Sequence, residues 1–572
     1  MAIIAIVCIL VGLATFGVIR EKYYPYLIYA ISLGLLLQVT LASPTLVGTD
    51  IHLEYYFANL TEKEGWDTSI PYLNNSAFGI VILAPWIVKI LHIDMLWVLK
   101  VIFPILFAGV PLLLYFVFKE WVTSKQAFLS AFFFVSMPTY FTELTGIARQ
   151  QIAEVFLAAC IFFIVVVKLE LKWKLPIVIL LALLVAVSHY SIGPILLFVL
   201  IVGFVVQLVL KTNIKFPAWA FALTVIILTI SSVFYYHNVA SGQPLRYMTA
   251  LIPVETQQVG PFTIGPMYPP FPPDEILCPP GQPKSEETPG TPPDTSPDTP
   301  SDTSPIVSYF SNHEGMVKSA MGMDFVGASV AGKIFRVLQY ITQIVIVVGF
   351  FMFLRGKKRS YYVLATSCAL LLALCIFVPG VSSILNITRF YHLSLFLLAP
   401  AFIVGGELVF RNLKVVAVCI LIPYFLFTSG FVFEAIKSEE ITKLDIPYSV
   451  PLSDYRIDLG GSPTQNDMLV RDWIAENDPT PLYADYFGVL FLQETLGTKK
   501  IYRLPEDCIA ASWNMEDMDI PEGSFIFLRE RGVATFWAGI GLRRQYTYDE
   551  IGLDKFGDIV YSVGKAEVRL VD

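Results

Sequence analysis

Long apolar runs separated by short polar loops make up the first three quarters of the chain. Several runs of roughly 17–22 residues have the length that a helix needs to cross a bilayer. We predict twelve membrane-spanning helices, at residues 1–19, 26–42, 95–118, 127–141, 151–168, 175–190, 194–210, 217–237, 333–354, 360–378, 391–410 and 413–431. The run 77–92 is shorter and is interrupted by Pro85 and Lys89, so we expect an interfacial helix there.

The basic residues of the short loops test this arrangement. With twelve spans, every short basic loop falls on one side of the membrane: Arg20 and Lys22, Lys119 and Lys125, Lys172 and Lys174, Lys211 and Lys215, residues 355–359, and Arg411 with Lys414. Such loops are typically cytoplasmic, so both termini are predicted to face the outside. Counting 77–92 as a full span would break the pattern. Residues 1–19 are not expected to be a signal peptide, because they lack a basic start and a small-residue cleavage site.

The opposite, extracytoplasmic side then carries the unusual segments. They are the first external loop 43–94, the loop 142–150, the turn 188–191, the external loop 238–332, the turn 379–392 and the region from about 437 onwards. Residues 279–305 are rich in Pro, Thr, Ser and Asp, a composition typical of disorder, either as a solvated insertion or as a glycosylated stalk.

Residues 437–572 differ from the membrane part, residues 1–436. Charge rises, and short strands are predicted in PLYAD, KKIYRL, SFIFLRE and VYSVGKAEVRL, with helices in DMLVRDWIAEN and YFGVLFLQETLG. This order predicts a small extracytoplasmic α/β domain. The fold class is therefore mainly α, a polytopic membrane protein with about twelve transmembrane helices and a small C-terminal α/β domain.

Composition agrees with a membrane protein. The chain is 55% hydrophobic and 15% charged, and soluble proteins carry more charge. The net charge of −8 gives no reason to expect a nucleic-acid partner. The seven cysteines show no CxxC spacing of the kind that binds metals.

Asp50, His52 and Glu54 follow the second predicted span closely. If the segment is extended, all three side chains point one way; if it is helical, Asp50 and Glu54 share a face and His52 leaves it. One carboxylate could then accept a proton while the other orients the reacting group or binds a cation. The alternative is a helix cap at Asp50 followed by solvated loop charges.

Arg149, Gln150 and Glu154 open a span on the same side. Gln150 and Glu154 are four residues apart, so Glu154 points a polar group about one turn into the membrane. The planar guanidinium of Arg149 suits an anionic lipid headgroup, although an interfacial arginine can simply reach toward water.

Two further polar groups are predicted at this level. His189 and Tyr190 occupy a tight turn, where a proton donor or a phosphate contact is as plausible as a structural histidine. Arg389, Tyr391 and His392 open another span and strengthen the idea of an anion site. Lys333 and Arg336 could add to it, or could be ordinary flanking charges.

Together, these residues from four loops suit group transfer on a lipid-linked phosphate. A carboxylate would activate the acceptor, and cations would stabilise the leaving phosphate as its negative charge develops.

An acidic motif in the first external loop soon after an early span, then many spans and an external C-terminal domain, resemble the GT-C superfamily of integral-membrane glycosyltransferases. More narrowly, GTDIHLEYYFANL, ARQQIAE, SHYS and RFYHLSLFLLAP resemble multi-span membrane proteins of archaea. The resemblance covers most of residues 26–431. It implies a polyprenyl- or dolichyl-phosphate sugar as donor, an inverting transfer on the extracytoplasmic face, and a glycan, lipid or protein acceptor. It also implies Asp50 as catalytic base, with Glu54 as second choice, and Arg149 and Arg389 as ligands of the lipid phosphate.

The sequence departs from that family in two respects. The acidic loop follows the second span rather than the first, and no WWDYG-type motif is present, which argues against N-linked oligosaccharide transfer. No metal is expected, although the spacing of Asp50, His52 and Glu54 leaves a divalent cation open. The alternative functions are a transporter or flippase for a lipid-linked or anionic substrate, and a non-catalytic scaffold of the cell envelope.

Overall fold

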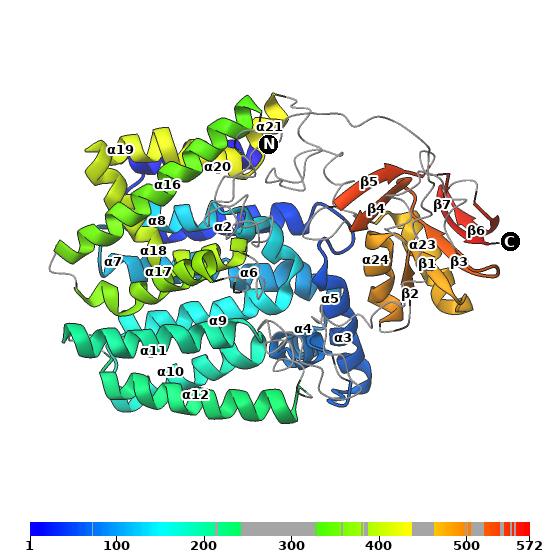
Figure 1. The fold of residues 1–572 in the computed structure, drawn as a ribbon, viewed down its shortest axis with the longest axis horizontal. Helices are drawn as coiled ribbons and strands as arrows, with labels where there is room; N and C mark the ends of the chain where they lie inside the picture. Colours follow the sequence, from blue (N-terminus) through cyan, green and yellow to red (C-terminus); the bar gives the residue numbers. More distant parts are fainter. Residues whose placement is uncertain are drawn as a thin grey trace, which may run out of the picture.

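The computed structural model describes most of the helical part and much of the C-terminal part. The described residues are 1–240 without 71 and 212–215, then 242, 325, 329–355, 359–378, 381, 387–436, 463–497, 499, 501–504, 520–537, 543–548, 552–553 and 556–571. The predicted disordered segment 279–305, most of the external loop 238–332 and residues 437–462 lie outside this set. The described residues form a bundle of helices with a smaller α/β part at one end (Figure 1).

Eight helices or helix runs of the described residues are long and apolar enough to cross a membrane. They are η1 with α2 (Glu21–Thr40), the run of α5 (Met95–Trp97), α6 (Phe103–Phe107) and α7 (Gly109–Lys119), α9 (Ala148–Val165), α10 (Leu171–Ser188), α11 (Ile192–Leu210), α12 (Ala218–Asn238), α16 (Val330–Arg355) and α18 (Ile387–Phe410). Each coincides with one of the predicted spans.

The other four predicted spans differ from a full-length straight helix. The span predicted at 127–141 is α8 (Ser124–Val135) followed by a bend of 58° into the segment Thr139–Gly146. The remaining three are apolar but shorter: α1 (Ala2–Thr15), α17 (Tyr362–Phe377) and the run Leu413–Thr428, which contains α19 (Leu413–Val415) and α20 (Ile422–Thr428). The predicted count of twelve spans is therefore not confirmed and stays a prediction.

The segment predicted as an interfacial helix is a short helix of two parts. It consists of the π-helical turn η3 (Gly79–Leu83) and α4 (Ala84–Leu91), with Pro85 near the start of α4. Trp86 and Ile90 of α4 are largely exposed. A short helix with exposed apolar side chains fits a position at the membrane surface.

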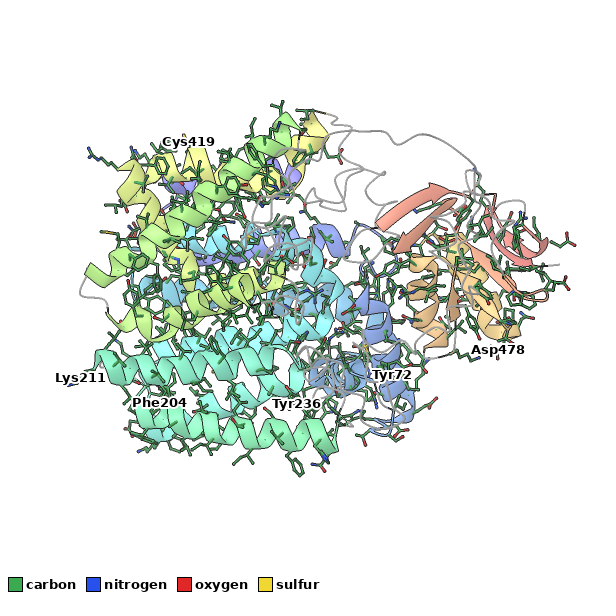
Figure 2. The ribbon with its side chains drawn as sticks, viewed as in Figure 1. Tyr72, Phe204, Lys211, Tyr236, Cys419 and Asp478 are labelled. Atoms are coloured by element: carbon green, nitrogen blue, oxygen red, sulfur yellow. The ribbon has the colours of Figure 1, made fainter. Side chains whose placement is uncertain are left out.

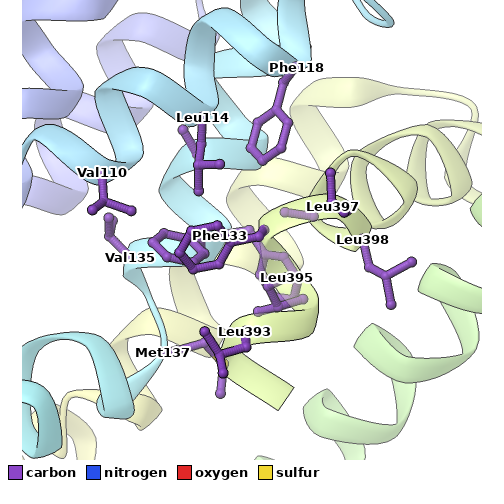
Figure 3. Close-up of a cluster of buried hydrophobic side chains, with 14 of the residues drawn as sticks. Val110, Leu114, Phe118, Phe133, Val135, Met137, Leu393, Leu395, Leu397 and Leu398 are labelled. Carbon is purple, nitrogen blue, oxygen red and sulfur yellow. The ribbon is translucent and has the colours of Figure 1, made fainter. Parts of the chain in front are cut away.

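The core of the bundle is apolar, and Figure 3 shows part of it between α7, α8 and α18. Val110 and Leu114 of α7, Phe133 of α8, and Leu395 and Leu397 of α18 are all at most 1% exposed. The rings of Phe133 and Phe402 stack with their centroids 4.2 Å apart. Close packing of this kind gives fixed positions to the helix ends that carry the polar residues.

Helices α16 and α18 approach each other closely through glycines. A Cβ on Gly349 would lie 1.8 Å from the carbonyl oxygen of Ala401, and one on Gly405 would lie 2.1 Å from that of Val345. Small residues allow such contact between the backbones of membrane helices.

The C-terminal part is a small α/β unit, as predicted. Strands β1 (Leu482–Ala484), β2 (Ile501–Arg503), β3 (Phe525–Leu528), β6 (Asp558–Val563) and β7 (Ala566–Leu570) form one sheet in the order β2-β1-β3-β7-β6. β1 pairs in parallel with β2 and with β3, whereas β7 runs antiparallel to β3 and β6. Helices α23 (Gln465–Asn477) and α24 (Tyr486–Leu496) coincide with the two predicted helices.

Two strand predictions need correction. The segment VYSVGKAEVRL is not one strand but the hairpin of β6 and β7, which turns at Gly564 and Lys565. The two-residue turn with glycine first is a recognisable hairpin signal. A second hairpin, β4 (Val533–Trp537) with β5 (Arg543–Thr547), was not predicted.

The basic loop after α11 and the C-terminal part lie at opposite ends of the molecule. Figure 2 shows Lys211 at one end of the long axis and Asp478 at the other, with Tyr72 and Tyr236 between them. Helix α3 (Asp50–Glu64) lies next to the C-terminal part (Figure 1). The first external loop and the C-terminal part thus share one end of the bundle.

Candidate functional site

Helix α3 begins at Asp50, so the helical alternative for this segment holds. Asp50 and Glu54 share a face, and both meet Arg149 at the start of α9. Arg149 Nη2 donates to Asp50 Oδ2 at 2.7 Å, and Nη1 donates to Glu54 Oε1 at 2.6 Å. The backbone N–H of Ala148 donates to Glu54 Oε2 at 2.6 Å. Two carboxylates are therefore fixed around one guanidinium.

The two carboxylates differ in exposure. Asp50 has a side chain that is 36% exposed, whereas that of Glu54 is 0% exposed. Burial raises the pKa of Asp50, but the charges of Arg149 and Arg389 outweigh it, so this pKa lies below its ordinary value. Burial raises the pKa of Glu54 to about 7, against the opposing charge of Arg149. Asp50 is thus the ionised and accessible member of the pair.

A close crossing of two turns brings α3 and α9 together. Gly48 has a φ of +135°, and a Cβ there would lie 2.4 Å from the Cα of Gly146. Only glycine permits both this backbone conformation and this approach. Asp50 follows two residues after Gly48, and Arg149 three residues after Gly146. The crossing therefore places the carboxylates and the arginine side by side.

Lys100 anchors the chain before α3. It is not among the site residues predicted from the sequence. Its side chain is buried, and Nζ donates to the carbonyl oxygen of Thr45 at 2.9 Å and also to that of Ser43. The signal in the sequence was a lysine inside an apolar span, which usually marks a specific contact.

Arg149 and His189 line one small cavity. The other lining residues come from the first external loop and from the ends of α10 and α12: Leu73, Ser76, Ala77, Ala186, Val187, Ser188, Tyr190, Tyr235 and Tyr236. The cavity volume is about 10 Å³, room for about one water molecule.

His189 presents a donor with no partner. The N–H of Ser191 donates to His189 Nδ1 at 3.2 Å, so in the neutral ring Nε2 carries the hydrogen. Nε2 and Arg149 Nε are both buried without a hydrogen-bond partner among the described residues. Burial and the charges of Arg149 and Arg389 lower the pKa of His189 well below its ordinary value, which keeps the ring neutral. Tyr190 stacks on this ring with the centroids 5.0 Å apart.

Arg389 lies near the site but is not part of this cavity. Its Nε is 3.7 Å from Glu143 Oε2, and its side chain is 22% exposed. Glu143 also accepts a hydrogen bond from Thr388 at 3.2 Å. Arg336 donates to Gln339 at 2.8 Å on its own helix, and neither Lys333 nor Arg336 lines the small cavity.

A second polar group lies inside the bundle. Gln150 Nε2 donates to Glu154 Oε1 at 2.9 Å, and His392 Nε2 lies 3.0 Å from Glu154 Oε2. The side chains of Glu154 and His392 are 0% exposed. Tyr391 lies next to Thr342 of α16. His392 thus lies with Glu154 and Tyr391 lies by Thr342, and neither residue lines the cavity of Arg149 and His189.

His52 is likewise separated from the carboxylate pair. Its Nδ1 lies 2.6 Å from Glu494 Oε1 on α24, and its Nε2 lies 3.0 Å from the carbonyl oxygen of Gly48. Both ring nitrogens are therefore engaged, and Asp50, His52 and Glu54 do not converge on one point. Within the described residues, no group of three or more His, Cys, Asp or Glu side chains has the geometry to hold a metal ion.

The comparison with protein families gives one match. A family described as predicted membrane protein (DUF2206) matches residues 303–540, a stretch that includes α16 to α18 and α24 but not α3 or α9. No match to a curated protein is found. The family description and the apolar helices agree: this chain is a membrane protein with multiple apolar helices in contact with the lipid bilayer.

Proposed function

We propose that this protein is a glycosyltransferase that uses a polyprenyl- or dolichyl-phosphate sugar on the extracytoplasmic face. One observation carries the proposal: a partly exposed carboxylate, Asp50, is fixed by a buried arginine that also lines a small cavity with His189. Fixed geometry between a base and an anion-binding group is what sugar transfer from a phosphate donor requires.

Asp50 is assigned as the general base. Its pKa below the ordinary value keeps the carboxylate ionised, and its exposure lets an acceptor hydroxyl reach it. Glu54 has no exposed surface and instead holds Arg149 in place, so it is a positioning residue. This division favours Asp50 over Glu54 as the reacting carboxylate.

The donor phosphate is assigned to Arg149 and His189, with Arg389 as a nearby positive charge. Arg149 Nε, His189 Nε2 and the hydroxyl of Ser188 are buried donors at the cavity without a partner among the described residues. A protonated Glu54 would leave Asp50 and Arg149 as a neutral pair, which does not repel an anion. A neutral histidine donor adds direction without adding charge.

The test is a transfer assay with purified full-length protein. Wild type, Asp50→Asn and the control Asp67→Asn are incubated with radiolabelled polyprenyl-phosphate sugars and an envelope extract. Asp67 is exposed and lies in the same external loop. We expect Asp50→Asn to lose about 100-fold or more of the transfer rate, the usual contribution of a general base, and Asp67→Asn to match wild type. No transfer by wild type across varied donors would refute the proposed function; full activity of Asp50→Asn would refute the base.

A transporter for a lipid-linked or anionic substrate is the second candidate. The observation that favours it is the Glu154–His392 pair, which is fully buried between α9 and α18. Transporters commonly carry ionisable groups inside the helix bundle. Protein-dependent movement of an intact labelled lipid-linked sugar across proteoliposomes, abolished in Glu154→Gln, would favour this candidate over the transferase.

A further inference from the structure

The face of α3 that points away from the carboxylate pair is held by the C-terminal part. His52 of α3 and Glu494 of α24 meet at 2.6 Å, and both side chains are 5% exposed. One turn further along α3, the ring of Tyr56 lies so close to Gly497 that a Cβ there would come within 2.0 Å of it. Residues 50 and 54 lie on one side of the helix, and residues 52 and 56 on nearly the opposite side.

The hydrogen bonds of His52 and Glu494 require one proton more than a neutral imidazole and an ionised carboxylate carry together. The carbonyl oxygen of Gly48 can only accept, so Nε2 at 3.0 Å must donate to it. A neutral ring then has only a lone pair at Nδ1, which faces Glu494 Oε1. The contact at 2.6 Å needs a proton between the two atoms, either as imidazolium or as carboxylic acid. Arg471 Nη1 donates to the other oxygen of Glu494 at 2.8 Å.

We propose that His52 and Glu494 form a proton-holding clamp by which the C-terminal part positions α3, and with it Asp50 and Glu54, against Arg149. His52 is a positioning residue in this proposal. Its consequence for sugar transfer rests on the proposed function, whereas the clamp itself does not.

The route from the clamp to the site is short. His52 donates to the carbonyl group of Gly48, and Gly48 is the residue that crosses Gly146. The chain continues from Gly146 to Ala148 and Arg149, which donate to Glu54 and Asp50. Release of His52 therefore frees the turn that sets the distance between the carboxylates and the arginine.

The direction of the pH dependence follows from the proton that His52 and Glu494 share, within charged surroundings. The ionisable groups around the pair are Arg471 and Asp472 of α23, Lys100 of the segment before α6, Asp94, Lys499, Tyr55 and Tyr56, and Asp50, Glu54 and Arg149 beyond the far side of α3. Loss of the shared proton leaves a carboxylate oxygen against a lone pair, which is repulsive. The clamp is therefore closed at low pH and opens as pH rises.

The test measures hydrogen–deuterium exchange of the full-length protein in nanodiscs from about pH 5 to about pH 9, the range around ordinary histidine titration. Rates are corrected for the intrinsic effect of pH on exchange. In wild type we expect the peptides of α3 and α24 to lose protection together as pH rises, by at least about tenfold, the effect of leaving a buried polar group unpaired.

The Glu494→Gln variant separates the clamp from a merely structural contact. Its amide oxygen can still accept from Arg471, while its NH₂ can donate to Nδ1 of a neutral His52. We expect α3 and α24 to stay protected across the whole pH range in this variant. His52→Ala should lose protection at every pH, with α16 and α18 peptides unchanged as a check of folding.

The matched control is His92→Gln, which removes an exposed histidine after α4. It should follow the wild-type pH profile. A wild-type profile without pH dependence, or a Glu494→Gln profile that follows wild type, would overturn the clamp. Since exchange is read without any sugar donor, a failed transfer assay leaves this test intact.

Discussion

Asp50 and Glu54 contact the same guanidinium but differ in what surrounds them. Asp50 reaches the surface, whereas Glu54 is enclosed by α3 and the start of α9. Environment rather than residue type thus divides the proposed roles of base and support, since burial separates the pKa values of neighbouring carboxyl groups. This division makes Glu54 the residue whose protonation can be observed directly.

We predict that Glu54 loses its proton near neutral pH. Because burial raises its pKa to about 7, the infrared band of a protonated carboxyl group should disappear as pH rises through that value. The direction of this change follows from burial. Burial favours the neutral, protonated form of Glu54, so the proton is lost only as pH rises. Infrared difference spectra should lack this band in Glu54→Gln and keep it in Glu64→Gln, whose side chain is exposed. An unchanged band in Glu54→Gln would contradict the assignment.

A second prediction compares the two arginines of the site. Arg149→Gln should lower the free energy of unfolding by about 3 kcal/mol or more, because it leaves two held carboxylates without their partner. Arg389→Gln should lower it by less than about 1 kcal/mol, because its ion pair at 3.7 Å is partly exposed. Unfolding of both variants in the same detergent measures the difference, and equal losses would show that Arg149 is not the anchor.

At the scale of the elements, α3 joins two parts of the protein by opposite faces. Its carboxylates meet α9, and its other face meets α24 through His52 and Tyr56. The long helices of the bundle hold α9 in place, and among the described helices α16 and α18 make a close backbone contact. That contact depends on the absence of a side chain at two positions.

Gly405→Ala should therefore destabilise the bundle. The added Cβ would lie 2.1 Å from the carbonyl oxygen of Val345, so α16 and α18 must move apart, at a typical overpacking cost of about 1–3 kcal/mol. The matched control is Gly34→Ala in α2, where no atom lies within 4 Å of the new Cβ. Alanine at this helical position should be neutral or stabilising by about 0.5–1 kcal/mol. Thermal unfolding that ranks the two variants the other way would contradict the contact.

The sequence predicts local structure at this scale and misses contacts between distant segments. Apolar runs placed the long helices, and the spacing of Gln150 and Glu154 placed both side chains on one face of α9. The pairing of His52 with Glu494 joins positions 442 residues apart, and no local pattern encodes it. The division of residues 560–570 into two strands was missed because both halves have strand composition, and only the turn at Gly564 separates them.

At the scale of the whole molecule, the polar site and the basic loops lie at different ends. The C-terminal part docks on α3, and Lys211 lies at the far end of the bundle. This separation agrees with the predicted side of the basic loops, while the orientation in the membrane and the roles of the site residues stay predictions. The sequence indicates which residue types could take part in chemistry. It does not show which polar groups meet, because that depends on helix packing.

The orientation can be tested by labelling. In a chain without its native cysteines, Lys211→Cys and Asp478→Cys are treated with a membrane-impermeant maleimide in right-side-out and in inverted vesicles. We expect Lys211→Cys to react only in inverted vesicles, because lysine-rich short loops face the cytoplasm, and Asp478→Cys only in right-side-out vesicles. Labelling of both sites from the same side would refute the predicted topology.

The small cavity beside Arg149 and His189 has a kinetic consequence. A volume of about 10 Å³ admits a water molecule but no sugar phosphate, so a donor can enter only after the walls from the first external loop, α10 and α12 have moved. Association of the proposed donor should then be limited by this opening, because binding that requires a conformational change is slower than binding to a preformed site. The observed binding rate should level off at high donor concentration, at a value equal to the rate of opening.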